Sequence, residues 1–238
     1  MVQQETQNYL EDRWHSGYIS EDGTALVVTD RKADTLIHPG DIEEIQRTLS
    51  ELQEKVPKAH VTVQIDNELM RNMTDGDEAA LAATTTGSAQ PLIAMTTRIA
   101  GKRETLKEKY GTEVAENWWP TELADIPAGK VILVHEWGHA ITDMQEVSDH
   151  YDALYQLGEN AENNKHGRSF ISQYSLQSPQ EFIAEAFCVW FLTNGTTRSR
   201  GAQSVARLFK WDEKYPKVVH PDPREPRGMQ HPIVRRTG

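Results

Sequence analysis

The chain has 238 residues, which is enough for one domain with a substantial hydrophobic core, and it shows no internal repeat. Its formal net charge of -11 argues against nucleic acid or an anionic membrane as the main partner. The single cysteine, Cys188, excludes a disulfide framework and a zinc site made of cysteines.

The first residues resemble no targeting segment. The start MVQQETQNYLEDRW lacks a basic stretch followed by an apolar core, and no apolar run reaches about 18 residues. We therefore expect no classical signal peptide and no transmembrane helix. The cytoplasm is the default location, although delivery by a toxin apparatus or packaging in a virus particle would leave the same sequence.

Residues 1–39 are expected to be an extension without visible chemistry. The stretch GYISEDGTALVV suggests a β-hairpin with Asp22-Gly23 as its turn. A domain is expected from residue 40 to residue 211. It opens with a helix from Asp41 to Val56, because apolar residues recur there at helical spacing and Pro57 follows.

Strand patterns follow this helix. Residues 59–65, AHVTVQI, alternate like a strand, and residues 82–99 suggest two short strands around a Gly-Ser-Ala-Gln-Pro turn. We expect Leu92 to Thr97 to be either an edge strand that pairs with an extended substrate or an ordinary strand of the sheet. Residues 100–117 are strongly charged and predict a solvated helix and turn. The next pair, Trp118-Trp119, is expected to pack in the core and, less favoured, to line a cleft.

The stretch from Val131 to Asp143, VILVHEWGHAITD, contains a His-Glu-x-x-His pattern. On a helix, His135 and His139 stand one turn apart on one face, so both imidazoles can bind one metal ion. Glu136 then lies beside the metal and can take a proton from a zinc-activated water. The alternative is a buried helix whose two histidines are only hydrogen-bonded core residues.

A catalytic zinc usually has three protein ligands. The long metzincin pattern is excluded, because it requires Gly at position 142 and His at position 145, where this chain has Thr142 and Gln145. Asp149 and His150 lie nearby, but their segment, DMQEVSDHYD, is polar and is more typical of a solvated helix end.

The segment from Ser178 to Gly195 predicts a second, buried helix that supplies the third ligand. Ser178 suits the N-cap, Pro179 suits the first helical position, and Asn194-Gly195 suits the C-terminus. Glu181 and Glu185 share one face of this apolar helix, and buried carboxylates need a partner. We assign Glu181 as the third zinc ligand and Glu185 as the acceptor that orients a ligand imidazole. The alternative for Glu181 is a capping box with Ser178.

These motifs resemble the gluzincin metallopeptidases. The closest likeness, over residues 125 to 193, is to the catalytic domain of the anthrax toxin lethal factor family, in which a similar zinc helix is followed by a tyrosine and a Glu-x-x-x-Glu helix. Here the corresponding residues are Tyr174 and the run from Glu181 to Phe187. The resemblance implies a zincin-like α+β fold, and it implies that Tyr174 stabilises the oxyanion or protonates the leaving amine. The alternative is a buried tyrosine that only packs.

The last residues, 212–238, are rich in Pro and Arg and predict a tail. His220 and His231 are expected to lie on the surface, and a larger protein assembly is a natural candidate to hold this tail. Together the patterns predict a zinc-dependent metalloendopeptidase that acts on a protein or peptide. The alternatives are a zincin-fold structural component, such as part of a phage particle, and a zinc amidase that acts on a cell-wall bond.

Overall fold

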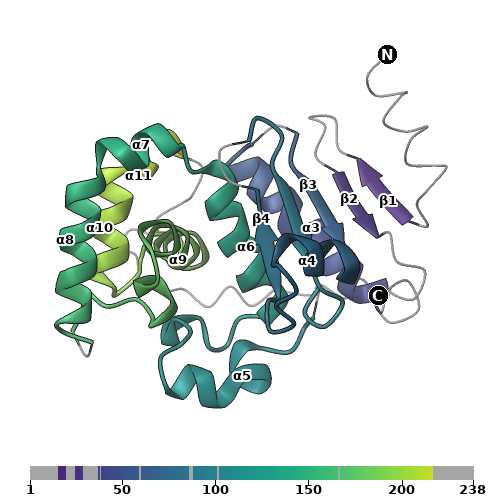
Figure 1. The fold of residues 1–238 in the computed structure, drawn as a ribbon, viewed down its shortest axis with the longest axis horizontal. Helices are drawn as coiled ribbons and strands as arrows, with labels where there is room; N and C mark the ends of the chain where they lie inside the picture. The colour runs from purple at the N-terminus through teal and green to yellow at the C-terminus, as the bar shows by residue number, and fades with distance from the viewer. Residues whose placement is uncertain are drawn as a thin grey trace, which may run out of the picture.

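The computed structural model of this chain describes residues 16–19, 25–28, 37, 39–58, 60–85, 88–100, 102–165 and 167–216. Helices and one sheet pack around a shared apolar core, which confirms the predicted α+β class (Figure 1). Among the described residues, no helix is both long and apolar enough to cross a membrane.

The sheet has five strands in the order β1-β2-β3-β5-β4. Strands β2, β3 and β5 run parallel, while β1 and β4 run antiparallel to their neighbours. The antiparallel pair β1–β2 agrees with the predicted hairpin, whose Asp22-Gly23 turn lies outside the described residues, and β2 joins it to the sheet of the domain. The bounds are β1 Ser16–Ile19, β2 Ala25–Val28, β3 Thr62–Ile65, β4 Ala82–Thr84 and β5 Leu92–Met95.

Of our two alternatives for Leu92 to Thr97, the structure supports the ordinary strand of the sheet and contradicts the edge strand. β5 lies between β3 and β4, so both of its backbone edges are paired, and the strand at this edge of the sheet is β4. The reason is visible in the burial: Ile93, Ala94 and Met95 are all fully buried, as in a strand covered on both faces. The side chains of β4 are only partly buried.

Two helices pack against each other beside the sheet. α3 (Pro39–Lys55) matches the predicted helix within two residues and packs against α6 (Ala128–Ile141). The indole N–H of Trp137 donates to the carbonyl of Val56 over 3.0 Å, just past the end of α3. Lys130 pairs with Glu51 across the same interface at 2.6 Å. α6 is thereby held between α3 and strand β4.

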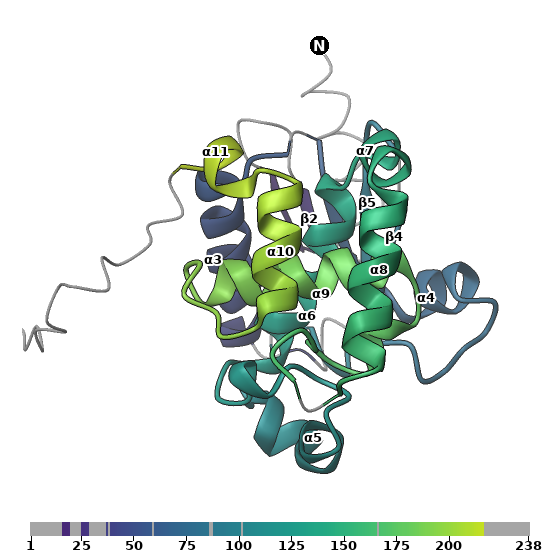
Figure 2. The same ribbon diagram turned by 90° about the vertical axis from the view of Figure 1, so that its left-hand side faces the viewer.

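α9 (Pro179–Leu192) is the central helix of the other half. Almost all of its side chains are buried, because α6 lies on one side and α8 (Tyr151–Glu162) and α10 (Arg200–Leu208) cover the other. Figures 1 and 2 show this sequence of layers, from the sheet through α6 and α9 to the outer helices. A helix that is apolar on every face needs such a complete cover.

α6 and α9 approach each other closely at Gly138. A Cβ atom there would lie 3.1 Å from the Cα of Ala184 and 3.2 Å from Cδ1 of Phe187. These distances are tighter than ordinary van der Waals contact, so any side chain would push the two helices apart. The glycine inside the His-Glu-x-x-His pattern is therefore explained by helix packing.

The remaining elements surround this core. Trp119 packs on Tyr110 with ring centroids 5.6 Å apart, whereas Trp118 is exposed, so the expectation of core packing holds for the second tryptophan only. α5 is the predicted charged helix, and it begins at a capping box formed by Thr105 and Glu108. The bounds are α4 Asn67–Met73, α5 Leu106–Ala115, η1 Thr121–Leu123, α7 Met144–Asp149, η2 Tyr174–Leu176 and α11 Trp211–Lys214.

The packed body extends past residue 211, where we expected the tail to begin. Trp211 is buried against Phe187 and Trp190, and Tyr215 lies against Trp190. Aromatic anchoring therefore holds α11 even though the segment has no apolar periodicity. His220 and His231 lie outside the described residues.

Candidate metal centre

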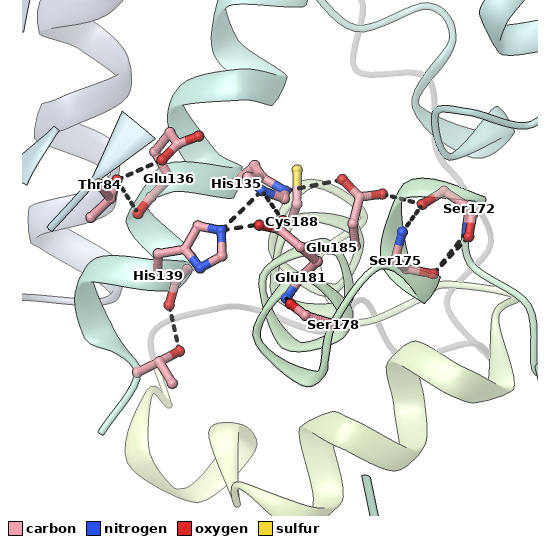
Figure 3. A network of polar contacts seen from close by, with 12 residues as sticks. Thr84, His135, Glu136, His139, Ser172, Ser175, Ser178, Glu181, Glu185 and Cys188 are labelled. Atoms are coloured by element: carbon pink, nitrogen blue, oxygen red, sulfur yellow. Dashed lines mark hydrogen bonds and ion pairs between the residues drawn. The ribbon is translucent and has the colours of Figure 1, made fainter. Parts of the chain in front are cut away.

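His135, His139 and Glu181 bring three ligand atoms together between α6 and α9 (Figure 3). The Nε2 atoms of the two histidines are 3.2 Å apart. Oε2 of Glu181 lies 3.0 Å from Nε2 of His135 and 3.3 Å from Nε2 of His139. The predicted third ligand thus lies beside the other two, although 42 positions separate it from His139 in the chain.

The spacing of these atoms fits a small metal ion. Zinc holds nitrogen and oxygen ligands at about 2.0–2.1 Å, and two ligands of a tetrahedral site are then about 3.3 Å apart. Oε2 of Glu181 is buried and makes no hydrogen bond, although two ring nitrogens surround it. A buried carboxylate oxygen that faces two ring nitrogens needs a proton or a metal cation between them. The group could therefore hold a metal ion.

The two explanations for Glu181 turn out to concern different atoms. Its backbone N–H donates to Oγ of Ser178 over 3.1 Å, so Ser178 is the N-cap of α9 as predicted. Its carboxylate turns to the histidines and not to the backbone of the cap. The residue thus combines half of the capping box with the position expected of a ligand.

Glu185 lies one turn deeper in α9 and is fully buried. One of its oxygens is 3.0 Å from Nδ1 of His135, and the other accepts a hydrogen bond from the hydroxyl of Ser172 over 2.8 Å. With Nδ1 protonated toward Glu185, the other ring nitrogen of His135 presents its lone pair to the metal position. This is the geometry that we predicted for an orienting carboxylate.

Ser172 links this carboxylate to the turn that carries Tyr174. Its Oγ accepts a hydrogen bond from the backbone N–H of Ser175 over 3.0 Å, while Oγ of Ser175 donates back to the carbonyl of Ser172 over 2.7 Å. These contacts close the turn η2 against α9. They place the ring of Tyr174 with its centroid 5.7 Å from that of His135.

Glu136 points to the sheet side of α6. One of its carboxylate oxygens accepts a hydrogen bond from the hydroxyl of Thr84 in strand β4 over 2.6 Å. The side chain is buried, so this contact compensates part of the cost of removing a carboxylate from water. Glu136 thus lies next to the ligand group without belonging to it.

The charges of the group depend on one another. Burial by itself lowers the pKa of His135, but the nearby carboxylates of Glu181 and Glu185 outweigh it and hold that pKa well above its ordinary value. Burial by itself raises the pKa of Glu181, but the contacts with His135 and His139 lower it to about 2. Protons and a metal ion therefore compete for the same three atoms.

Two neighbouring groups stay protonated. Burial, together with the carboxylates of Glu181 and Glu136, raises the pKa of Tyr174, so its phenol is a hydrogen-bond donor at neutral pH. Burial also raises the pKa of Cys188, whose thiol donates to the carbonyl of Val131 over 3.3 Å. Cys188 is buried in the core and does not belong to the ligand group.

The rejected candidates lie outside the group. Asp149 accepts a hydrogen bond from the side chain of Gln145, and His150 lies edge-on against the ring of Phe209. Their polar segment forms α7 and the start of α8. Both residues nevertheless stay apart from His135 and His139, in agreement with our prediction.

Two residues that contribute to the site, Thr84 and Ser172, could not be predicted from the sequence. Thr84 lies in a run of threonines, and Ser172 lies in a loop of mixed composition. Neither has a spacing that marks chemistry, because each reaches the site only through the pairing of β4 with β5 or the folding of the 171–178 segment. Because these carboxylates are buried, each needs a hydrogen-bond donor. Burial alone does not predict which residue supplies that donor.

The chain matches no protein-family model, no curated protein and no solved structure.

Proposed function

We propose that this protein is a zinc-dependent metalloendopeptidase with a zincin-like fold. The observation that carries the proposal is the convergence of His135, His139 and Glu181 within 3.3 Å of one another, with the buried Glu136 next to His135 on the same helix. Two imidazoles and one carboxylate are a common ligand set of catalytic zinc in peptidases, and they leave a fourth position for the reaction.

The zinc ion, when bound, supplies a Lewis acid that polarises the substrate carbonyl and makes water more acidic. Glu136 is the general base in this proposal, because its carboxylate lies beside the ligands and is not one of them. Its task is to remove a proton from the attacking water and to deliver that proton to the leaving amine. Metal binding alone would not require this residue.

Tyr174 and Glu185 have supporting roles in the proposed reaction. The raised pKa of Tyr174 keeps its phenol protonated, so the hydroxyl can donate a hydrogen bond to the oxygen that gains negative charge. Glu185 fixes the tautomer of His135, and its own position is fixed by Ser172. Each role uses a side chain that is already held by contacts within the protein.

Strand β4 is the place where we propose that the substrate binds. Among the described strands it pairs with β5 on one side only, and it packs against α6, which carries Glu136. An extended peptide can add to such an edge by backbone hydrogen bonds. A protein or peptide is therefore the substrate class that this geometry favours.

Metal analysis and digestion together test the proposal. Protein purified without chelator or affinity metal should contain about one zinc per chain by inductively coupled plasma mass spectrometry. It should cleave casein or a peptide library, and 1,10-phenanthroline should stop the cleavage. Iron in place of zinc, or zinc without hydrolysis, would contradict a zinc peptidase.

The same assay separates the other two functions. Cleavage of purified peptidoglycan without cleavage of casein would indicate a zinc amidase. Bound zinc without hydrolysis of either substrate would indicate a structural or interaction protein, and binding partners would then be sought by crosslinking. No observation on the described residues favours either function over the peptidase.

A further inference from the structure

Thr84 makes the contact that joins the sheet to Glu136. Its hydroxyl oxygen lies 2.6 Å from Oε2 of Glu136 and 3.3 Å from the backbone carbonyl of the same residue. A hydroxyl has one proton, and the shorter contact takes it. A hydroxyl–carboxylate contact of 2.6 Å has the length of a strong hydrogen bond.

This contact restricts the side chain of Glu136. Once Oε2 is held by Thr84, the carboxylate can turn only by breaking a hydrogen bond inside a largely buried site. The remaining oxygen is then free to act as the proton acceptor. Without Thr84, the side chain of Glu136 would have several rotamers available, and only some of them would direct an oxygen toward the ligand group.

Thr84 belongs to the strand on which we propose that the substrate binds. In β4 it is paired with Ile93 of β5, so its backbone position is set by the sheet. A shift of this strand moves the hydroxyl that holds Glu136. The placement of the substrate and the placement of the base are therefore determined by one element.

We propose that Thr84 is a positioning residue that orients the general base Glu136 from the substrate-binding edge strand. The inference rests on the proposed function for its catalytic part. The contact itself is independent of that function, and it can be measured whether or not the protein hydrolyses a peptide.

The neighbouring residue supplies a matched control. Thr85 follows directly in the chain, but its Oγ accepts a hydrogen bond from the backbone N–H of Leu92 over 2.9 Å, within the β4–β5 hairpin. Thr84→Val and Thr85→Val each remove one hydroxyl and keep a β-branched side chain of similar volume. Only the first removes the donor to Glu136.

The first experiment observes the contact directly. In zinc-loaded protein labelled with ¹³C at the glutamate side-chain carboxyls, the resonance that disappears in Glu136→Gln belongs to Glu136. We expect this resonance to move in Thr84→Val and to stay in place in Thr85→Val and Thr84→Ser. An unchanged resonance in Thr84→Val overturns the inference, whatever the activity.

The second experiment measures the consequence. Thr84→Val should lower kcat by about 10- to 100-fold, as for other residues that orient catalytic groups, with little change in KM or in zinc content. Thr84→Ser, which keeps the donor, should retain most of the rate, and so should Thr85→Val. A loss shared equally by both valine variants would show a general effect on the hairpin and would overturn the positioning role.

The two experiments distinguish failure of this inference from failure of the proposed function. A wild-type protein without chelator-sensitive hydrolysis overturns the peptidase and the catalytic role of Thr84 together. A wild-type protein that hydrolyses peptides, with kcat unchanged in Thr84→Val, overturns the inference alone.

Discussion

The α6–α9 pair carries histidines and carboxylates, and the α7–α8 pair carries carboxylates with His150 between its two helices, but the two pairs place these groups in opposite surroundings. In the first pair, His135, Glu136 and Glu185 are buried and contact one another or a residue far away in the chain. In the second pair, Asp149 and Glu159 are exposed and accept hydrogen bonds from residues four positions away on their own helix.

The difference lies in burial and not in residue type. An exposed carboxylate is solvated, so it needs no particular partner and creates no special site. A buried carboxylate must be compensated, and three buried ligand atoms without enough protons between them require a cation. The α6–α9 pair could therefore hold a metal ion, whereas α7 and α8 form a charged surface.

The largest expected effect is on turnover. Glu136→Gln should lower kcat by about 100- to 10,000-fold, since the general base is lost, while zinc stays bound. Asp149→Asn on α7 should leave both kcat and zinc content unchanged. Peptide cleavage and metal content of the three proteins check this, and turnover that survives in Glu136→Gln would exclude the proposed mechanism.

The next effect concerns metal affinity. Glu181→Gln removes a ligand charge and should weaken zinc binding by more than the 10- to 100-fold that is typical for an outer-shell partner. Glu159→Gln on α8 is the matched change in the exposed region, and we expect it to have no effect. Competition with a zinc chelator measures both affinities. An unchanged zinc affinity in Glu181→Gln would show that Glu181 is not a ligand and only takes part in the N-cap of α9.

A pair of helix glycines extends the comparison to packing. Gly138→Ala introduces a methyl group 3.1 Å from the backbone of α9 and should destabilise the protein by about 1–3 kcal/mol. Gly158→Ala on α8 meets nothing within 4 Å and should stabilise it by up to about 1 kcal/mol. Urea unfolding gives both free energies of unfolding, and equal values would contradict the close approach of α6 and α9.

The smallest effect is a pH dependence of the metal-free protein. The pKa of Glu181 is lowered to about 2, so its contribution to stability is complete above 4.5 and is lost as the pH falls toward 2. The pKa of His135 is raised, so its contribution is complete below 6.5 and is lost as the pH rises through the raised value.

Thermal unfolding at several pH values tests this assignment. The metal-free wild type should have its highest Tm in mild acid, and Glu181→Gln should flatten the profile on both sides. Bound zinc should reverse the alkaline side, because deprotonated imidazoles bind it more tightly. A wild-type profile identical to that of Glu181→Gln would contradict the coupling between these residues.

Local pattern determined the parts of this protein that depend on neighbours in sequence. The helical spacing of His135 and His139 follows from 3.6 residues per turn, and the N-cap at Ser178 follows from its hydroxyl and the proline behind it. The apolar sequence around Glu185 already required a partner for that carboxylate. For these reasons the two site helices and their buried charges could be predicted.

Only the tertiary structure decided which distant segments meet. The order of the strands made β4 and not β5 the edge, because pairing in a sheet depends on contacts that no local pattern records. The same pairing brought Thr84 to Glu136, and the packing of η2 brought Ser172 to Glu185. Hydroxyl groups are common and fit many surroundings, so their roles become visible only when the fold places them beside a buried charge.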